Sequence, residues 1–362
     1  MGYKKDTVKV HIVPQLYGVY LVQSIPKKNS FYIGSTNDPE RRLQQHNGLK
    51  TGGAYRTKPL AKRPWQMILY VHGFPSKATA LSFEFSFQHA YKSRHIPSSE
   101  RIVTSKSGGH SMAHKLLFVR QLIKSPFFSK MGLKVQLFTN EAYKCWCDNK
   151  FGVLISDRVN VQYVDEDKRD LDINLGHVKQ FKDKVIQCDK EVLSKYSKTF
   201  EFGELECILC PEKIDYINSD QFPLVAMCYR CDCLTHLSCL AREFIEQTKD
   251  KEDEQMRLTQ KKQRAQRKNI SSGNDIGREE PVFIPDGGII PSKGTCPKCG
   301  KMLMWPTLVR NATRARASQG FTLEEPLTQS GSQFLPKESQ SGDYDVDGDD
   351  DEDISIVPDL NE

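Results

Sequence analysis

Four pairs of metal-binding residues, each pair separated by two positions, constrain the fold of this chain more than any other feature. The pairs are Cys207 and Cys210, Cys228 and Cys231, His236 and Cys239, and Cys296 and Cys299. Two intervening residues let a tight turn bring both side chains to one ion, and Cys and His ligands in fours are typical of structural Zn²⁺. The eight ligands therefore predict two tetrahedral zinc sites.

The second pair has a competing ligand. Cys233 lies two residues after Cys231, so either residue is able to complete a site with Cys228. The spacing of the other pairs favours Cys231, and the choice stays open. Three further cysteines have no partner at ligand spacing and are expected to be structural: Cys145, Cys147 and Cys188.

The order of the ligands resembles that of the cross-braced RING/PHD superfamily. The resemblance implies that the first and third pairs hold one zinc ion and that the second and fourth pairs hold the other. Ile208 and Pro297 favour a RING, and Gly294 replaces the aromatic residue that a PHD reader usually carries there. Ubiquitin transfer is then an alternative function, but the long gap between Cys239 and Cys296 favours a protein-docking module.

The composition indicates an intracellular protein with two domains. A length of 362 residues predicts two domains with tails. No apolar run is long enough to span a bilayer and the start lacks a secretory signal, so we expect no membrane association and a reducing compartment. The eleven cysteines are then expected to be metal ligands rather than disulfides.

Charge is distributed unevenly along the chain. Residues 1–110 contain seventeen Lys or Arg and five Asp or Glu, a net charge of +12, whereas the whole chain carries +6. A basic first third and an acidic end predict that the N-terminal domain binds a polyanion such as nucleic acid. The alternative is a solvated basic face without a ligand.

Hydrophobic patterning predicts an α+β fold. Residues 1–145 are expected to form a small domain with a mixed sheet and flanking helices. Its predicted elements are a hairpin at 13–36, helices at 39–46, 76–91 and 116–123, and strands at 65–74 and 132–139. A helical linker at 146–203, with a long helix at 175–200, leads to a zinc domain at 204–310. That domain contains a charged helical insertion at 241–269, and residues 311–362 are expected to be a disordered acidic tail.

The predicted hairpin carries glycine and tyrosine in mirrored order, as Gly18-Val19-Tyr20 and Tyr32-Ile33-Gly34. Taken alone, the two tyrosines are ordinary half-buried strand residues, and a later His46 is able to cap a helix. Glu84 is less easily explained. It is the only acid between residues 40 and 100 and lies among three phenylalanines, where a carboxylate is costly unless it is paired or metal-bound.

The two tripeptides, followed by Arg42, His46 and Glu84, resemble the ordered signature of GIY-YIG endonucleases. The resemblance implies that Tyr20, Tyr32, Arg42, His46 and Glu84 are catalytic. Glu84 would hold one Mg²⁺ or Mn²⁺, and Arg42 would clamp the phosphate. Tyr20 is expected to be the general base if nearby cations lower the pKa of its phenol, with Tyr32 and His46 orienting water and phosphate. Which tyrosine is the base stays open.

The phrases HNGLKTGGAYRTK, WQMILYVHGFPS and GTCPKCGKMLMW resemble the catalytic subunits of SLX-type structure-specific endonucleases. This resemblance implies cleavage of 5′ flaps, replication forks and Holliday junctions in the nucleus, in DNA repair and recombination. It also implies that the zinc domain binds a larger scaffold subunit, and it leaves self-association of the free subunit open.

Two further segments suggest binding surfaces. Basic residues beside Tyr55 and Trp65 predict a DNA-backbone surface with stacking capability. They are Arg41, Lys50, Arg56, Lys58, Lys62 and Arg63. Near the end, residues 354–357 (ISIV) follow eight acids within 343–353, a weak pattern of SUMO-binding strands. A solubilising acidic tail is the favoured alternative.

Overall fold

The computed structural model describes residues 13–156, 159–164, 170–201, 205–214, 225–249 and 290–318. The tail motif at 354–357 and all of the predicted charged insertion beyond residue 249 lie outside the described residues.

A mixed five-stranded sheet forms the centre of the N-terminal domain. Its strands are β1 (Gly18–Ser24), β2 (Phe31–Thr36), β3 (Trp65–His72), β4 (Lys134–Leu137) and β5 (Asn160–Tyr163), in the order β2-β1-β3-β4-β5. The first four strands pair antiparallel, and β5 joins β4 in parallel. The predicted α+β class with a mixed sheet is confirmed. The sheet extends beyond residue 145, because β5 comes from the segment predicted to be a linker.

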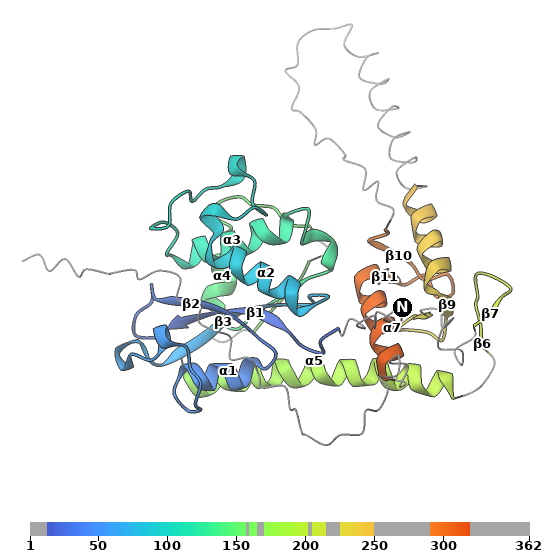
Figure 1. Cartoon of the computed structure of the whole chain (residues 1–362), viewed down its shortest axis with the longest axis horizontal. Helices are drawn as coiled ribbons and strands as arrows, with labels where there is room; N and C mark the ends of the chain where they lie inside the picture. Colours follow the sequence, from blue (N-terminus) through green and yellow to red (C-terminus); the bar gives the residue numbers. More distant parts are fainter. Residues whose placement is uncertain are drawn as a thin grey trace, which may run out of the picture. The chain divides into compact units, whose positions relative to one another are not determined.

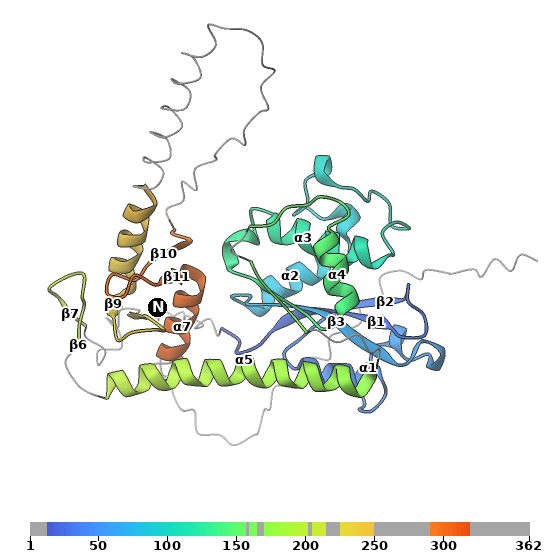
Figure 2. The same ribbon diagram turned by 180° about the vertical axis from the view of Figure 1, so that it is seen from behind.

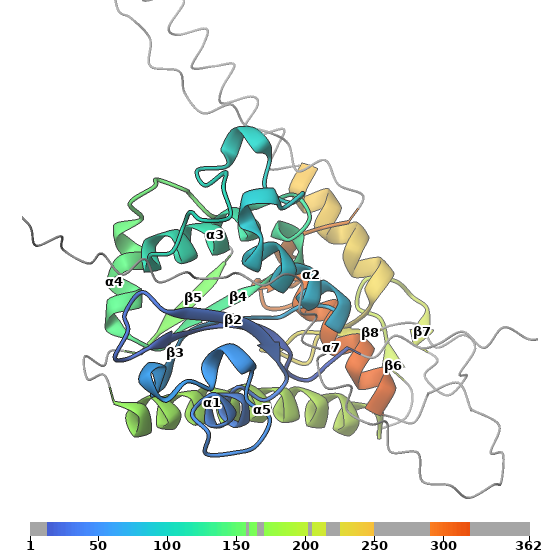
Figure 3. The ribbon, with the colours of Figure 1, turned by 60° about the vertical axis from the view of Figure 1, so that its left-hand side comes forward.

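Helices cover both faces of the sheet (Figures 1 and 3). One face carries α2 (Lys77–Gln88), α3 (Met112–Lys124) and α4 (Asn140–Asp148), and the other carries α1 (Pro39–His46) and α5 (Leu171–Phe200). Single 3₁₀ turns connect these elements: η1 (Tyr55–Thr57), η2 (Leu60–Lys62), η3 (Ala90–Lys92), η4 (Ser98–Glu100) and η5 (Ser129–Met131). The helix predicted at 39–46 has the same bounds in the structure.

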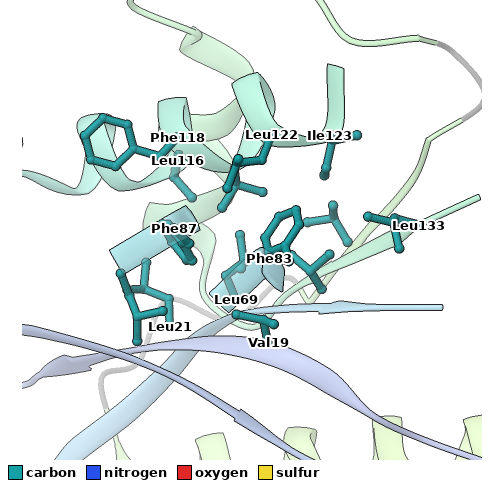
Figure 4. Packing of buried hydrophobic residues seen from close by; sticks show 14 of the residues in the cluster. Val19, Leu21, Leu69, Phe83, Phe87, Leu116, Phe118, Leu122, Ile123 and Leu133 are labelled. Carbon is teal, nitrogen blue, oxygen red and sulfur yellow. The ribbon is translucent and has the colours of Figure 1, made fainter. Parts of the chain in front are cut away.

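Alternation along β1 divides the domain into two cores. Val19 and Leu21 point to the α2 and α3 side, where Phe83 and Phe87 of α2 pack on them (Figure 4). Tyr20, the residue between them, points to the opposite core, which contains side chains of α1 and α5. The first core is an ordinary apolar interior, whereas the second contains phenol groups and is the one that carries the candidate site.

Helix α5 is an unbroken element of 30 residues that passes alongside α1 (Figure 2). Near its start, the Asn174 side chain exchanges two hydrogen bonds with the Met67 backbone of β3, at 2.8 and 3.0 Å. Near its end, Tyr196 and Phe200 are buried among residues of the predicted zinc module (205–214, 225–249 and 290–318). The bridging helix predicted at 175–200 is therefore present, and it contributes to the second core of the N-terminal domain and to the core of the zinc module.

Short strand pairs and two helices build the zinc module. The strands are β6 (Leu205–Glu206), β7 (Lys213–Ile214), β8 (Val225–Met227), β9 (Leu234–His236), β10 (Lys293–Thr295) and β11 (Met302–Met304). One helix is described over residues 237–249, and α7 spans Trp305–Ser318. The tail predicted to be disordered from residue 311 was placed too early, because residues 311–318 continue α7. None of the helices in the described ranges is both long and apolar enough to cross a bilayer.

Candidate active site

Helix α1 presents two predicted catalytic residues to the sheet. Asp38 caps the helix by accepting a backbone N–H of the first turn at 3.1 Å, and Pro39 occupies the first position. Arg42 and His46 are four residues apart, so they share one helical face. Both reach the Tyr20 hydroxyl of β1, which lies 3.0 Å from the Arg42 Nε and 2.8 Å from the His46 Nε2.

The mirrored glycines make room for tyrosine rings. Tyr20 faces Gly34 across the β1–β2 pair, and a Cβ at Gly34 would lie 2.4 Å from the Tyr20 hydroxyl oxygen. A Cβ at Gly18 would lie 2.6 Å from the Tyr70 ring of β3. Only a residue without a side chain fits at either position. Gly34 makes room for Tyr20 of the first tripeptide, whereas Gly18 makes room for Tyr70 and not for Tyr32.

The network continues to Thr57 in η1, which the sequence analysis did not single out. The His46 Nδ1 lies 2.9 Å from the Thr57 Oγ1, and the Thr57 hydroxyl donates to the Ala54 carbonyl oxygen at 2.9 Å. Tyr20, His46 and Thr57 have no exposed surface. No spacing or composition signal marks Thr57, because its role depends on how the loop after α1 folds back.

Burial keeps the two inner groups neutral. Burial raises the pKa of the Tyr20 phenol, and the nearby Arg42 charge only partly offsets it. Burial also lowers the pKa of His46 to about 3, helped by the positive charges of Arg42 and Arg63. This differs from the expectation that cations would lower the pKa of Tyr20, because desolvation outweighs them.

Tyr32 is the phenol that solvent reaches. Its ring centroid lies 5.0 Å from that of His46 and 6.4 Å from that of Tyr20, and its side chain is partly exposed. Burial alone would lower the pKa of Arg42, but charge interactions and hydrogen bonds with the Tyr20 and Tyr32 phenols together raise it above its ordinary value. The guanidinium therefore stabilises negative charge on either phenol oxygen.

Arg42 is held in place by the loop after α1. Its Nη1 donates to the Gly52 carbonyl oxygen at 3.0 Å and to the Gln45 Oε1 at 3.2 Å. Together with the bond from its Nε to Tyr20, these contacts fix the plane of the guanidinium. The Nε and Nη1 hydrogens already have protein acceptors, so a phosphate would meet the fixed positive charge of Arg42 rather than a free two-nitrogen fork.

Glu84 approaches the same site from α2. The Gln88 Nε2 donates to the Glu84 Oε1 at 3.1 Å and to the Ile33 carbonyl oxygen of β2 at 3.1 Å. Burial raises the pKa of Glu84, while a hydrogen bond from Ser35 and the charge of Arg42 oppose that rise. The carboxylate therefore lies beside β2 and within the field of Arg42.

The predicted apolar surroundings of Glu84 are only partly present. Phe83 and Phe87 are buried in the first core, on a different face of α2, and Phe85 is 57% exposed. The helical period separates the three rings from the carboxylate. The Glu84 carboxylate is nevertheless suited to a hard divalent cation, because it is a partly exposed oxygen ligand, whereas Gln88 presents its Nε2–H to the carboxylate.

The predicted DNA-binding residues fall into two groups. Arg41, Lys50, Arg56 and Lys58 are exposed, whereas Lys62 and Arg63 are partly buried. The Arg63 Nε donates to the Thr57 carbonyl oxygen at 3.2 Å, so this side chain also supports the loop.

The two aromatic residues of the predicted stacking surface differ. Trp65 is only 1% exposed and donates its Nε1–H to the Thr57 carbonyl oxygen at 3.3 Å. It is a structural residue and offers no stacking face, contrary to the prediction. Tyr55 is 76% exposed, with the Lys58 Nζ 5.8 Å from its ring centroid. Tyr55 is therefore the available stacking residue.

The structure gathers the zinc-type ligands into two groups of four. Cys207, Cys210, His236 and Cys239 form one group, and Cys228, Cys231, Cys296 and Cys299 form the other. The Cys228 and Cys299 sulfurs are 3.8 Å apart, and those of Cys231 and Cys296 are 3.7 Å apart. Tetrahedral Zn²⁺ with Zn–S bonds of about 2.3 Å places its sulfurs about 3.8 Å apart, so the donors fit zinc.

Cys233 lies outside both groups. Its side chain is buried, and its carbonyl oxygen accepts the Cys228 N–H at 3.1 Å. Helix α5 supports the same site, because the Lys195 Nζ donates to the carbonyl oxygens of Cys228 and Cys231 at 2.7 and 2.6 Å. The positive charge of Lys195 therefore lies beside a group of four thiols.

Comparison with known proteins extends these observations. Residues 16–96 match the GIY-YIG catalytic domain family. The structure-specific endonuclease subunit SLX1 of Debaryomyces hansenii is 36% identical over 365 residues, covering 93% of this chain and 96% of that protein. The SLX1 subunit of Kluyveromyces lactis is 37% identical and covers 85% of this chain and 97% of its own length. That of Scheffersomyces stipitis is 41% identical over 67% of this chain and 78% of its own length.

Proposed function

The chain belongs to the family of SLX1 structure-specific endonuclease subunits with a GIY-YIG catalytic domain, and from this premise we propose that it cuts branched DNA in a metal-dependent reaction. The proposed substrates are 5′ flaps, replication forks and Holliday junctions. The proposed setting is the nucleus, in DNA repair and recombination, with a larger scaffold subunit bound through the zinc module.

The observation that carries this proposal is the fixed guanidinium of Arg42 beside the carboxylate of Glu84. Arg42 is oriented by Tyr20, Gln45 and Gly52, and its charge opposes the burial-driven rise in the pKa of Glu84. A phosphodiester placed between them would meet the fixed positive charge of Arg42 on one side and the Glu84 carboxylate, as a metal ligand, on the other. Preorganised charge of this kind is the main contribution of a nuclease to phosphoryl chemistry.

The residues of the site would then have different roles in cleavage. Glu84 would hold one Mg²⁺ or Mn²⁺, which when bound neutralises phosphoryl charge and acidifies water. Arg42 binds a non-bridging phosphate oxygen. Tyr32 is the phenol with access to water, so we assign it the contact with the attacking water and the role of proton acceptor. Tyr20 and His46 are buried and act by holding Arg42 rather than by touching water.

The exposed basic loop would track the DNA backbone beside Arg42 and Glu84. Lys50, Arg56 and Lys58 supply positive charge, and Tyr55 offers a ring to an unpaired base. Branched DNA exposes such bases where its strands diverge. The loop therefore supports binding of a junction better than binding of intact duplex.

The test compares Arg42→Ala with Arg94→Ala, an exposed arginine of the same domain. Each full-length variant is assembled with its scaffold subunit and given labelled 5′-flap and four-way-junction DNA with Mg²⁺ or Mn²⁺. We expect Arg42→Ala to lose at least about 100-fold in cleavage rate while binding to the junction falls much less, because the transition-state clamp is removed. Arg94→Ala should cut like wild type. Undiminished cleavage by Arg42→Ala would show that the site formed by Arg42 and Glu84 is not the active site.

A further inference from the structure

The Thr57 hydroxyl has one proton and two neighbours able to accept it. The Ala54 carbonyl oxygen and the His46 Nδ1 both lie 2.9 Å from the Thr57 Oγ1. The ring of His46 also carries one proton when neutral, on either Nδ1 or Nε2. The position of the Thr57 proton therefore decides the tautomer of His46, and the tautomer decides which way the bond to Tyr20 runs.

Only one arrangement gives every proton an acceptor. If Thr57 donates to Ala54, the His46 Nδ1–H donates to Thr57, and the Tyr20 hydroxyl donates to the His46 Nε2. If Thr57 instead donates to His46, the Nε2–H and the Arg42 Nε–H both point at the Tyr20 oxygen. The phenol proton of Tyr20 then has no other acceptor among the described residues. Leaving a buried donor unpaired is costly, so the first arrangement is favoured.

Thr57 is fixed well enough to impose this choice. Its backbone N–H donates to the Ala54 oxygen at 3.0 Å, and its own carbonyl oxygen accepts from Arg63 at 3.2 Å and from Trp65 at 3.3 Å. The Trp65 backbone is held in turn by the side chain of Asn47 at the end of α1, through bonds of 2.7 and 2.9 Å. The hydroxyl is therefore held between the loop and the catalytic helix.

We propose that Thr57 is a positioning residue for DNA cleavage, whose hydroxyl holds His46 in the Nδ1–H tautomer. In this tautomer the His46 Nε2 accepts a hydrogen bond from the Tyr20 hydroxyl, and the Tyr20 oxygen accepts a hydrogen bond from the Arg42 Nε. Thr57 thereby orients Arg42, the proposed phosphate-binding residue, through His46 and Tyr20. The inference about the tautomer depends on the geometry alone, whereas its consequence for cleavage rests on the proposed function.

The first test reads the tautomer directly in the full-length protein, without DNA. Nitrogen-15 NMR of histidine-labelled protein distinguishes a protonated from an unprotonated ring nitrogen, and His46→Gln identifies the signals of this ring. We expect the wild type and Thr57→Ser to show a protonated Nδ1. Thr57→Val removes the acceptor with little change in volume, and should move the proton wholly or partly to Nε2. A protonated Nε2 in the wild type, or an unchanged ring in Thr57→Val, would overturn the proposal.

The second test measures single-turnover cleavage of a 5′ flap by the complex with its scaffold subunit. Thr57→Val should cut about ten-fold more slowly, the loss expected when one buried hydrogen bond no longer orients a transition-state contact. The cleavage rate of Thr57→Ser should stay within about three-fold of wild type. Thr51→Val changes an exposed threonine of the same loop and should cut at the wild-type rate. Equal rates for Thr57→Val and Thr51→Val would contradict the positioning role.

The two tests separate the inference from the proposed function. If the wild type does not cut branched DNA, the proposed function fails while the NMR result still decides the tautomer. If Thr57→Val lowers the rate and the melting temperature without changing the His46 ring signals, Thr57 is only structural and the proposal is wrong.

Discussion

Replacing Gly34 by alanine tests whether the candidate active site depends on close packing of Tyr20 against β2. The added Cβ would lie 2.4 Å from the Tyr20 hydroxyl oxygen and 2.7 Å from its Cζ. Ordinary contact begins near 3.4 Å, so the phenol must retreat by about 1 Å. A shift of this size disrupts the bonds of 2.8 Å to His46 and 3.0 Å to Arg42.

The magnitude follows from these contacts. Overfilling a packed core costs about 1–3 kcal/mol, and two weakened buried hydrogen bonds add about 1 kcal/mol each. We therefore expect Gly34→Ala to lower the free energy of unfolding by about 3–5 kcal/mol. Because Arg42 loses its support, the cleavage rate should fall about 100-fold even where the protein remains folded.

Urea unfolding followed by circular dichroism and single-turnover cleavage of a 5′ flap measure the two effects. Gly176→Ala is the matched control, because a Cβ there meets no atom within 4 Å. It lies inside α5, where alanine should stabilise the helix by about 0.5–1 kcal/mol. If Gly34→Ala has the stability and rate of Gly176→Ala, the packing argument for the mirrored glycines is wrong.

Three further predictions concern protonation, zinc and DNA. Burial, assisted by nearby positive charge, lowers the pKa values of His46 and His72 to about 3; the unfolded state, with histidines near 6.5, therefore binds more protons between pH 3 and 6.5. The free energy of unfolding should fall as pH drops below 6.5, by about 2 kcal/mol for each of the two histidines at pH 5. In urea unfolding, His72→Phe should show only the contribution of His46, which is about half of the total loss of the wild type. Metal analysis should find about two Zn²⁺ per chain in Cys233→Ser and fewer in Cys231→Ser; equal loss in both would contradict the ligand grouping. Tyr55→Ala should weaken binding to a flap by about ten-fold with little effect on intact duplex, as measured by fluorescence anisotropy, and an equal effect on both DNAs would exclude stacking on unpaired bases.

The sequence predicted most of what depends on local spacing. The helix at 39–46 was recognisable from its cap, its proline and the Asn47–Gly48 stop, and these signals act within a few residues. The signature residues Tyr20, Arg42 and Glu84 were found because their order along the chain is itself the signal. Ligand pairs two residues apart likewise predicted two metal sites, and the resemblance to cross-braced RING/PHD domains implied the grouping that the structure shows.

What the sequence missed depends on contacts between distant segments. The role of Thr57 could not be predicted from the sequence, because it depends on how the loop after α1 places the Thr57 hydroxyl beside His46. The roles of the tyrosines depend on burial, because Tyr20 faces a core completed by α5, more than 150 residues away in the chain. The loss of Trp65 from the predicted stacking surface has the same cause, since its strand is central in the sheet and covered on both faces.

The central claim is that the site formed by Arg42 and Glu84 cuts DNA, and a matched pair of glutamates tests it most directly. Glu84→Gln removes the carboxylate that is proposed to bind the metal and keeps the shape of the side chain. Glu100→Gln makes the same change at an exposed residue that pairs with Lys124 at 3.0 Å on the surface. With the scaffold subunit, Mg²⁺ and a labelled 5′ flap, we expect Glu84→Gln to bind the flap but to lose at least about 1,000-fold in single-turnover rate, while Glu100→Gln cuts like wild type. Cleavage by Glu84→Gln at the rate of Glu100→Gln would contradict the account.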